Sequence, residues 1–181
     1  MARITIIGGA GQYGSLIVRE AANRGHEVTC YSLNEPIEPA PRVNYKITSI
    51  VDPSIRDEAL SRIDVVLVAT STDHNDADHH DEAVIAGLVA LAATRSIPLG
   101  IVSRLRGHAH ARLLGELSSK STPGQLDWFV LTPDLESLHD CEKSRRGDDS
   151  VVLVDSRGTS EIPGVDLWVV AVDEAETRAR T

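Results

Sequence analysis

Short apolar runs alternate with longer amphipathic segments along this chain. Asp64–Ala69 is apolar at every position after the first, as expected for a strand covered on both faces. His79–Thr94 instead spaces its larger apolar residues at helical intervals. The same criteria predict further strands at Ile4–Ile7, Glu27–Ser32, Val43–Ile47, Ile97–Ser103, Asp127–Thr132 and Val151–Val154. They predict further helices between Gly14 and Gly25, from Asp52-Pro53 to Arg62, over Ala109–Ser119 and over Val165–Arg178.

Polar and proline-rich loops separate these elements. Asn34–Pro41 contains three prolines, which exclude a helix or a central strand there. Other loops are predicted at Thr70–Asp78, Arg104–Gly107, Asp134–Asp149 and Gly158–Pro163. Alternating strands and helices predict an α/β fold with a doubly wound, mostly parallel sheet. We expect a single domain over residues 1–181, in which 134–181 form a smaller substrate-side and closing segment.

A glycine cluster follows the first predicted strand immediately. Two spacings fit it, G-x-G-x-x-G beginning at Gly9 and G-x-x-G-x-x-G beginning at Gly8, and both end at Gly14. Glycine lets the chain reverse sharply and lets its backbone approach a pyrophosphate. Amides of the following helical turn then face the phosphates, aided by the helix dipole. Strand, glycine turn and helix together predict the opening unit of a Rossmann-type dinucleotide-binding fold.

The bulk composition narrows the possible partners. A formal net charge of −9 argues against nucleic acid, because binding its phosphates requires a basic face. No apolar run is long enough to span a membrane, and the chain starts with a strand instead of a signal peptide. We therefore expect a cytoplasmic protein without membrane contact. The two cysteines, Cys30 and Cys141, form neither a metal-type spacing nor a disulfide framework.

Four stretches make most of the chain similar to a known family. They are Gly8–Gly14, Arg24–Thr29, Asp52-Pro53 with Asp64–Val66, and Leu126–Pro133, which carries a Leu-Asp-Trp run before its proline. On these residues the chain resembles the atypical short-chain dehydrogenase/reductases that include NAD(P)H-flavin reductase or biliverdin reductase B-like proteins and NmrA-like sensors. The resemblance implies NADP or NAD as the cofactor and a small molecule as the substrate. It leaves a homodimer or a protein partner as an expectation.

The resemblance also implies where the cofactor lies. The pyrophosphate would follow the glycine turn, the adenosine the end of the second strand, and the nicotinamide the ends of the fourth and fifth strands. The implied cofactor-binding residues are Gly8, Gly9, Gly11, Gln12, Tyr13, Gly14, Ser32, Leu33, Asn34, Ala69, Thr70, Ser71 and Ser103. Two residues on the same edge, His74 and Ser103, are candidate catalytic residues, His74 as a proton donor and Ser103 as a hydrogen-bond partner of a carbonyl.

The chain also departs from the family pattern. NADP-preferring relatives place an arginine just past the second strand, where this chain has Leu33, and Glu35 lies late for the acid of NAD binders. The choice between NAD and NADP therefore stays open. None of the three tyrosines is followed by lysine four residues later, so the Tyr-x-x-x-Lys pair of typical members is absent.

The segment Asp73–Glu82 is unusually rich in histidine and acidic residues. It lacks H-E-x-x-H or a comparable ligand spacing, so we predict no metal site and interpret it as a solvated loop whose acids favour the next helix. Its place after a central strand also puts His74 near the expected nicotinamide.

Two main functions are consistent with these features. The first is an NAD(P)H-dependent oxidoreductase of the flavin-reductase type, acting on an unidentified small molecule. The second is a non-catalytic NAD(P)-binding redox sensor or scaffold of the NmrA-like type, which the missing tyrosine–lysine pair favours. An oxidoreductase that uses a deazaflavin is a weaker third hypothesis.

Overall fold

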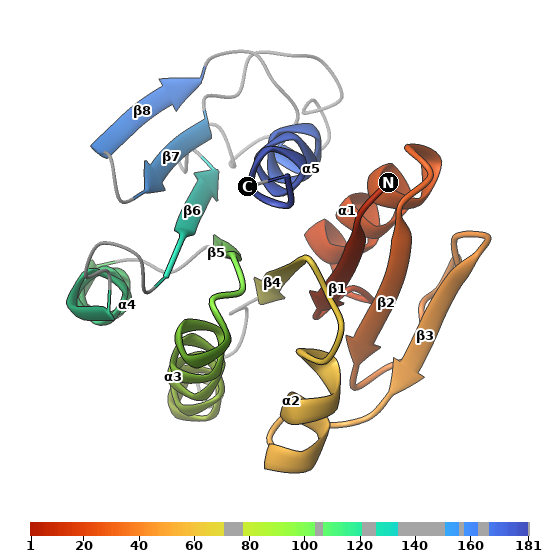
Figure 1. Ribbon diagram of the computed structural model, residues 1–181, viewed down its shortest axis with the longest axis horizontal. Helices are drawn as coiled ribbons and strands as arrows, with labels where there is room; N and C mark the ends of the chain where they lie inside the picture. Colours follow the sequence, from red (N-terminus) through yellow and green to blue (C-terminus); the bar gives the residue numbers. More distant parts are fainter. Residues whose placement is uncertain are drawn as a thin grey trace.

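An eight-stranded sheet forms the centre of the described part of this computed structural model (Figure 1). The structure describes residues 1–70, 78–103, 107–120, 126–133, 151–155, 158–162 and 167–180. The strands are β1 (Arg3–Ile7), β2 (Glu27–Ser32), β3 (Val43–Ile47), β4 (Val65–Thr70), β5 (Leu99–Ser103), β6 (Trp128–Pro133), β7 (Val151–Asp155) and β8 (Gly158–Ile162). Their order across the sheet is β3-β2-β1-β4-β5-β6-β7-β8.

The first six strands are parallel, and β7 and β8 add antiparallel pairs at one edge. The order 3-2-1-4-5-6 is that of a doubly wound sheet, so the predicted fold class is confirmed. The chain leaves β1 toward β2 on one side and returns to β4 on the other. The strand order therefore reverses between β1 and β4, where open parallel sheets bind ligands beyond the carboxyl ends of their strands.

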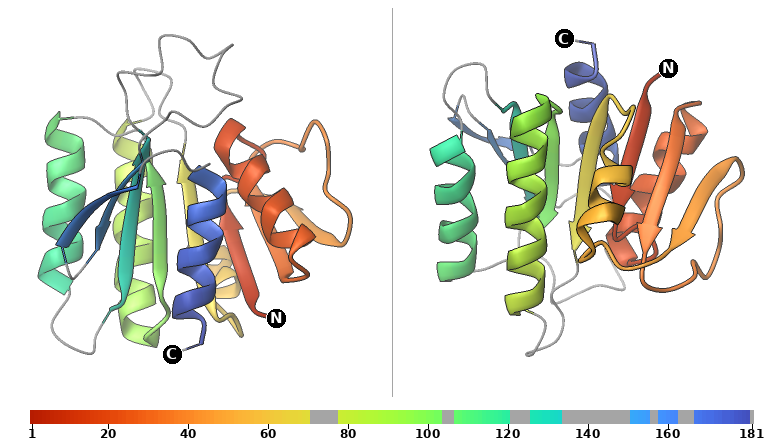
Figure 2. Two further views of the ribbon diagram at one scale, coloured as in Figure 1. Left: turned by 90° about the horizontal axis from the view of Figure 1, so that it is seen from above. Right: turned by 60° about the horizontal axis from the view of Figure 1, so that its bottom comes forward.

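Helices cover both faces of the sheet (Figure 2). They are α1 (Gln12–Asn23), α2 (Pro53–Ala59), α3 (Asp78–Arg95), α4 (Gly107–Lys120) and α5 (Leu167–Arg178). One face packs on α1 and α5, with Ile17, Val18 and Val172 fully buried. The other face packs on α2, α3 and α4, where Leu88 and Leu117 are fully buried.

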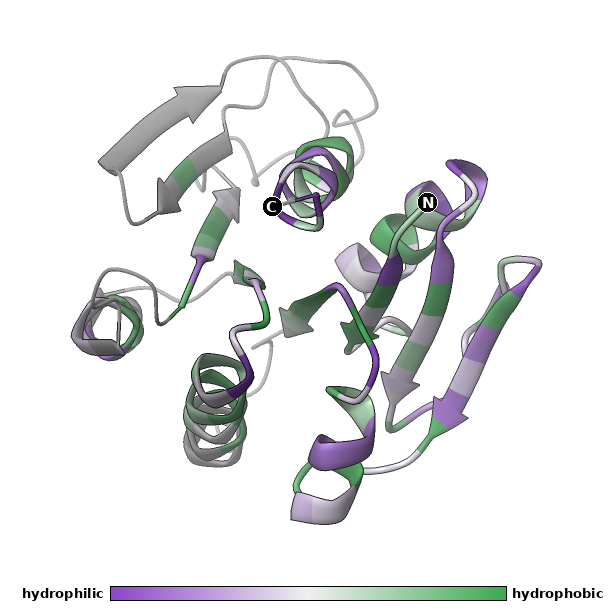
Figure 3. Ribbon diagram, viewed as in Figure 1, coloured by the Kyte–Doolittle hydropathy of each residue, from purple (hydrophilic) through white to green (hydrophobic). Residues whose placement is uncertain are grey.

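Hydropathy along the strands follows from this layered arrangement. Apolar residues concentrate on the central strands, whereas the edge strand β3 alternates apolar with polar residues (Figure 3). Val65, Val66, Leu67 and Val68 are all fully buried, because consecutive residues of β4 enter the two opposite cores. The predicted interpretation of this run as a strand covered on both faces is confirmed.

Two sequence predictions need correction. Gly158–Pro163 was expected to be a loop, but Gly158–Ile162 forms β8, which pairs with β7 from Asp155↔Gly158 to Val151↔Ile162. Ladder hydrogen bonds to β7 stabilise a segment whose glycine, serine and glutamate disfavour strands. The second helix was expected to reach Arg62 but ends at Ala59. Leu60 caps its end, and Arg62 has a left-handed φ of 58° that no helix accommodates.

Candidate functional site

The glycine turn begins where β1 ends. The Gly8 amide donates to the Tyr31 carbonyl at 2.8 Å, and the Gly8 carbonyl accepts from the Gly11 amide at 3.0 Å. Gly8 has a φ of +81°, in the left-handed region that favours glycine. A Cβ at this position would lie 2.2 Å from the Ala69 carbonyl oxygen. Only glycine therefore allows the chain to reverse here, close to Ala69 near the end of β4.

Gly9 and Gly14 close the turn onto the helix. A Cβ on Gly9 would lie 2.4 Å from the Cys30 sulfur and 2.8 Å from Cγ2 of Val18. A Cβ on Gly14 would lie 2.2 Å from the Gly8 carbonyl oxygen. Glycines from both spacings, G-x-G-x-x-G and G-x-x-G-x-x-G, thus have a steric role in the turn. Gly8 supplies the reversal, and Gly9 and Gly14 allow α1 to pack directly on the turn.

The N-terminus of α1 has features that favour an anion. Gly11 is its N-cap, with an extended backbone (φ −72°, ψ 171°), and a glycine has no side chain with which to cap the helix. The first helical turn also carries no acidic residue. The first amides of a helix have no partner within the helix, and the helix dipole makes this end positive. The cradle formed by Gly8, Gly11 and the first residues of α1, Gln12 and Tyr13, suits a phosphate.

Cys30 lies beneath this cradle and is fully buried. Burial raises the pKa of its thiol to about 11, and a hydrogen bond from the Gly9 backbone partly offsets the rise. The thiol therefore stays protonated and acts as a small apolar floor under the turn, as the sequence indicated. A spacing pattern alone does not reveal this contact, because Gly9 and Cys30 meet only through the parallel pairing of β1 with β2.

The carboxyl ends of the central strands bring other expected site residues together. Ala69 contacts the turn through its backbone, and Thr70 pairs with Ser103 across β4 and β5. The expected nicotinamide contacts from these two strands are therefore adjacent in the sheet. Ser71 and His74 lie outside the described residues.

The opposite side of the switch point carries Ser32, Leu33 and Asn34. The Ser32 carbonyl accepts from the Thr48 amide at 2.9 Å, and Leu33 is 71% exposed. No lysine or arginine occurs from Ser32 to Glu38. Arg19 of α1 reaches this loop, where its guanidinium pairs with Glu38 at 2.9 Å. This end of the site is therefore neutral to acidic.

Tyr31 and Lys46 are in contact in the fold, although their separation in sequence does not match the Tyr-x-x-x-Lys pattern. Tyr31 and Lys46 are register partners on β2 and β3, and the Lys46 ammonium lies 5.4 Å from the centre of the Tyr31 ring. The Lys46 ammonium also pairs with Glu58 of α2, whose pKa is lowered by that contact. Tyr31 is only 2% exposed, and burial raises the pKa of its hydroxyl. These contacts join α2 to the sheet. The buried Tyr31 hydroxyl is therefore not placed as an exposed catalytic acid would be.

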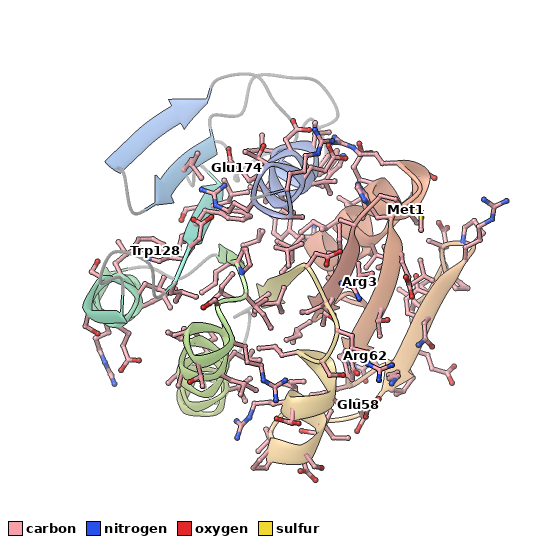
Figure 4. All side chains as sticks on the ribbon, viewed as in Figure 1. Met1, Arg3, Glu58, Arg62, Trp128 and Glu174 are labelled. Atoms are coloured by element: carbon pink, nitrogen blue, oxygen red, sulfur yellow. The ribbon has the colours of Figure 1, made fainter. Side chains whose placement is uncertain are left out.

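The remaining described aromatic residues have structural contacts. The Tyr45 hydroxyl accepts from the Ala40 amide at 3.0 Å and holds the proline-rich loop. Trp128 is 3% exposed and packs on the α3 and α4 side of β6 (Figure 4), which confirms its interpretation as a core residue. Tyr13 packs partly buried against the α1 and α5 core.

Neither a metal cluster nor a membrane span occurs in the described ranges. No group of three or more metal-ligating side chains is found there, and Asp73–Ala77 fall outside those ranges. Among these residues, no helix has the length and apolar character needed to cross a bilayer.

Comparisons with known proteins agree with this geometry. No protein-family model and no curated protein matches this sequence. A putative NADH-flavin reductase from Streptococcus pneumoniae superposes with a TM-score of 0.66 at 19% identity, covering 98% of this chain and 94% of that one. A putative exported protein from Burkholderia pseudomallei gives 0.62 at 25% identity, with 97% and 94% covered. The Bordetella bronchiseptica enzyme WbmH, solved in complex with NAD+, gives 0.59 at 16% identity.

This chain adopts a Rossmann fold. The match to WbmH covers 73% of this chain but only 55% of WbmH, whereas the other two matches cover nearly all of both chains. In a Rossmann fold the turn after β1 is the phosphate-binding position. In this chain that turn has steric constraints that require glycine at positions 8, 9 and 14.

Proposed function

We propose that this protein is an NAD(P)H-dependent oxidoreductase of the flavin-reductase type that acts on a small molecule. The dinucleotide would lie across the carboxyl edge of the sheet, with its pyrophosphate on the cradle formed by Gly8, Gly11 and the first turn of α1. Adenosine would extend toward Ser32, and nicotinamide toward Thr70 and Ser103. The observation that carries the proposal is the start of α1, with a glycine N-cap and no acidic residue in its first turn, beside a left-handed Gly8.

The residues present fit this group sterically and electrostatically. Side chains are excluded at Gly8, Gly9 and Gly14 by contacts of 2.2–2.4 Å to a Cβ, so the turn keeps its backbone close to any bound phosphate. When bound, the nicotinamide supplies the hydride chemistry. The chain's own contribution is to orient the dinucleotide and to give an anion its hydrogen bonds. Two solved neighbours, the Streptococcus protein named for NADH-flavin reduction and NAD+-bound WbmH, support this choice of ligand.

A non-catalytic redox sensor is the second candidate. The observation in its favour is that two tyrosine hydroxyls have structural surroundings: Tyr31 is buried, and Tyr45 is bonded to Ala40. Neither is exposed as a proton donor for a carbonyl. A sensor would bind the dinucleotide tightly and require a protein partner to report its state. Flavin reduction, in contrast, requires mainly stacking of the two rings, so the absent acid weighs less against the first candidate.

The cradle is tested by substituting its N-cap. Gly11 has a φ of −72°, which any residue adopts, and aspartate is a favourable N-cap, so Gly11→Asp should fold. Its carboxylate would repel the pyrophosphate. Gly11→Asn is the matched control, because it caps the helix with the same shape and no charge. We expect calorimetric titration of NADH and NADPH to give at least about tenfold weaker binding for the aspartate variant than for the asparagine variant.

Two results would count against the proposal. Equal binding by Gly11→Asp and wild-type protein would show that the phosphates do not bind at this turn. Failure of the wild-type protein to bind NADH, NADPH or their oxidised forms would show that a dinucleotide is not its ligand. Oxidation of NADH or NADPH with FMN as acceptor then separates the two candidates, since the sensor binds without turnover.

A further inference from the structure

Thr132 carries a buried hydroxyl that has no hydrogen-bond partner within the described part of the chain. It is the penultimate residue of β6, at the carboxyl edge of the sheet, and it pairs with Val152 of β7. Val130, two residues earlier, packs on the α3 and α4 side, and a strand places alternate residues on one face. The Thr132 hydroxyl is therefore enclosed on that side, just below the edge where this fold takes its ligands.

A second threonine shows what this chain does with a hydroxyl that serves structure. Thr5 of β1 is 1% exposed, and its hydroxyl donates to the Ala59 carbonyl at 2.8 Å, which joins the sheet to the end of α2. Buried polar groups are normally paired in this way, because leaving one unpaired is costly. Valine has nearly the same shape as threonine and avoids that cost. The contacts of the described residues thus give no structural reason for a hydroxyl at position 132.

The sheet register places Thr132 beside the expected nicotinamide contacts. Thr70 pairs with Ser103, and Val102 pairs with Leu131, so Thr132 follows Ser103 in the same row. Neighbouring strands lie about 4.8 Å apart, so the row from Thr70 to Thr132 spans about 10 Å at the carboxyl edge. That length suits a ring system with one polar substituent. Both ring systems expected at this edge, nicotinamide and flavin, carry a carbonyl oxygen that accepts hydrogen bonds.

We propose that the Thr132 hydroxyl donates a hydrogen bond to a carbonyl oxygen of the bound ligand and extends the site across β6. This inference rests on the proposed function. Two sources supply the carbonyl, the carboxamide of the nicotinamide and the ring of a flavin substrate. The cost of the unpaired hydroxyl in the free protein is recovered when the ligand binds, as is common for site residues that trade stability for function.

The first test compares the melting temperatures of three variants. Thr132→Val removes an unpaired hydroxyl, so the free protein should melt at the wild-type temperature or about 2–4 °C above it. Thr5→Val removes a paired hydroxyl in the same kind of strand and should melt lower. Thr132→Ser keeps the hydroxyl and is the control for binding. A Thr132→Val protein that melts lower, as Thr5→Val does, would show that this hydroxyl has a structural partner and would overturn the inference.

The second test asks which ligand carries the carbonyl. If it is the carboxamide, Thr132→Val should bind NADH or NADPH about tenfold more weakly while ADP-ribose, which lacks the nicotinamide, binds unchanged. If it is the flavin, dinucleotide affinity should stay constant and KM for FMN should rise by a similar factor. Thr132→Ser should behave as wild type in either case. The Thr5→Val variant, altered inside β1 and outside the row from Thr70 to Thr132, should leave binding unchanged.

The outcomes separate this inference from the proposed function. Wild-type protein that binds dinucleotide, combined with a Thr132→Val variant whose binding and turnover are both unchanged, overturns the inference alone. Wild-type protein that binds no dinucleotide overturns the proposed function, and the role of Thr132 with it. Weaker binding of ADP-ribose by Thr132→Val would also contradict the inference, because the adenosine end lies across the sheet from β6.

Discussion

Gly8 and Gly25 share a backbone angle but have different surroundings. Both have a φ of +81°, yet a Cβ would lie 2.2 Å from the Ala69 carbonyl oxygen at Gly8 and would meet nothing within 4 Å at Gly25. Gly25→Ala should therefore cost only the left-handed strain, about 1–2 kcal/mol. Gly8→Ala should cost about 1–3 kcal/mol more, because the contact forces the turn away from β4.

Urea unfolding of Gly8→Ala and Gly25→Ala measures both the cost of the left-handed backbone and the cost of the contact with Ala69. The difference between their free energies of unfolding isolates the steric part, since the strain is common to both. Similar losses would mean that Ala69 moves aside at little cost. In that event the close approach of β4 to the turn is no constraint on the residue at position 8.

At the residue scale, sequence predicts what backbone geometry demands and misses what tertiary contact decides. The glycine turn was predicted because it is local and because glycine alone tolerates it. The contact of Gly9 with Cys30 was outside such reasoning, since a full helix separates the two residues. The same holds for Thr132, whose sequence neighbours give no indication that its hydroxyl is buried and lacks a hydrogen-bond partner among the described residues. For His74 and Ser71, which lie outside the described residues, the site roles stay predictions.

At the scale of elements, apolar pattern placed β1 to β7 closely but missed β8. Strands β2 and β3 were predicted with their observed bounds, because each has β-branched residues and a clear boundary. The segment Gly158–Ile162 has little apolar pattern, and only its pairing with β7 makes it a strand. The end of α2 was placed three residues late, since nothing local showed that Arg62 takes a left-handed conformation.

The end of β2 determines which dinucleotide this chain should prefer. From Ser32 to Glu38 the chain carries Glu35 and Glu38 and no basic residue, and Arg19 is already paired with Glu38. A 2′-phosphate requires a cation at this place. We therefore expect NADH to bind more tightly than NADPH. Leu33→Arg, at a 71% exposed position, should improve NADPH binding by about tenfold or more, as measured by titration.

Ile37→Arg is the matched control for that change. Ile37 belongs to the same loop and is 97% exposed, but it lies four residues further from the strand. The control adds the same charge to the protein without placing it at the end of β2. Equal gains for both variants would indicate long-range attraction of the anion. Tighter NADPH than NADH binding by wild-type protein would contradict the expected preference directly.

At the scale of the whole molecule, charged pairs join segments that are distant in sequence. Arg24, near the end of α1, pairs with Glu20 and with Asp173 of α5, and His26 contacts Glu176 at 2.8 Å. At the C-terminal end of α5, Arg178 pairs with Asp127 and with Glu174 of the same helix, which is labelled in Figure 4. The Arg24–Glu20 and Arg178–Glu174 pairs are local, each with its members four residues apart. The contacts that Asp173, Glu176 and Arg178 make with residues outside α5 do not follow from the sequence, because each depends on how α5 docks.

Asp64 should make stability depend on pH. The Arg3 guanidinium and amide donate to its carboxylate at 2.6 and 2.8 Å and hold the pKa of Asp64 below its usual value. A carboxyl with a lowered folded pKa stabilises at neutral pH, and that stability is lost as pH falls below the unfolded pKa of about 4. Asp64→Asn should therefore cost about 0.5–1 kcal/mol at pH 7, a modest value because the pair is partly exposed.

Thermal melting between pH 7 and pH 3 measures this effect. The gap between wild-type and Asp64→Asn proteins should narrow as the pH falls toward 3, because the wild-type carboxyl becomes protonated and loses the same interaction. Asp52, Glu58 and Glu176 also have lowered pKa values, so both proteins should lose stability together. A gap that is constant over this range would mean that the charge of Asp64 contributes nothing.

Both chain ends lie at the side of the sheet away from the glycine turn (Figure 2). The Ala2 amide donates to His26, which in turn contacts Glu176 in the last helix, so the two ends are held close together there. Anything fused to either end, such as an affinity tag, a fluorescent protein or a surface linker, would emerge on that side. The protein could accordingly be immobilised by either end on a sensor chip with its glycine turn facing the flowing solution.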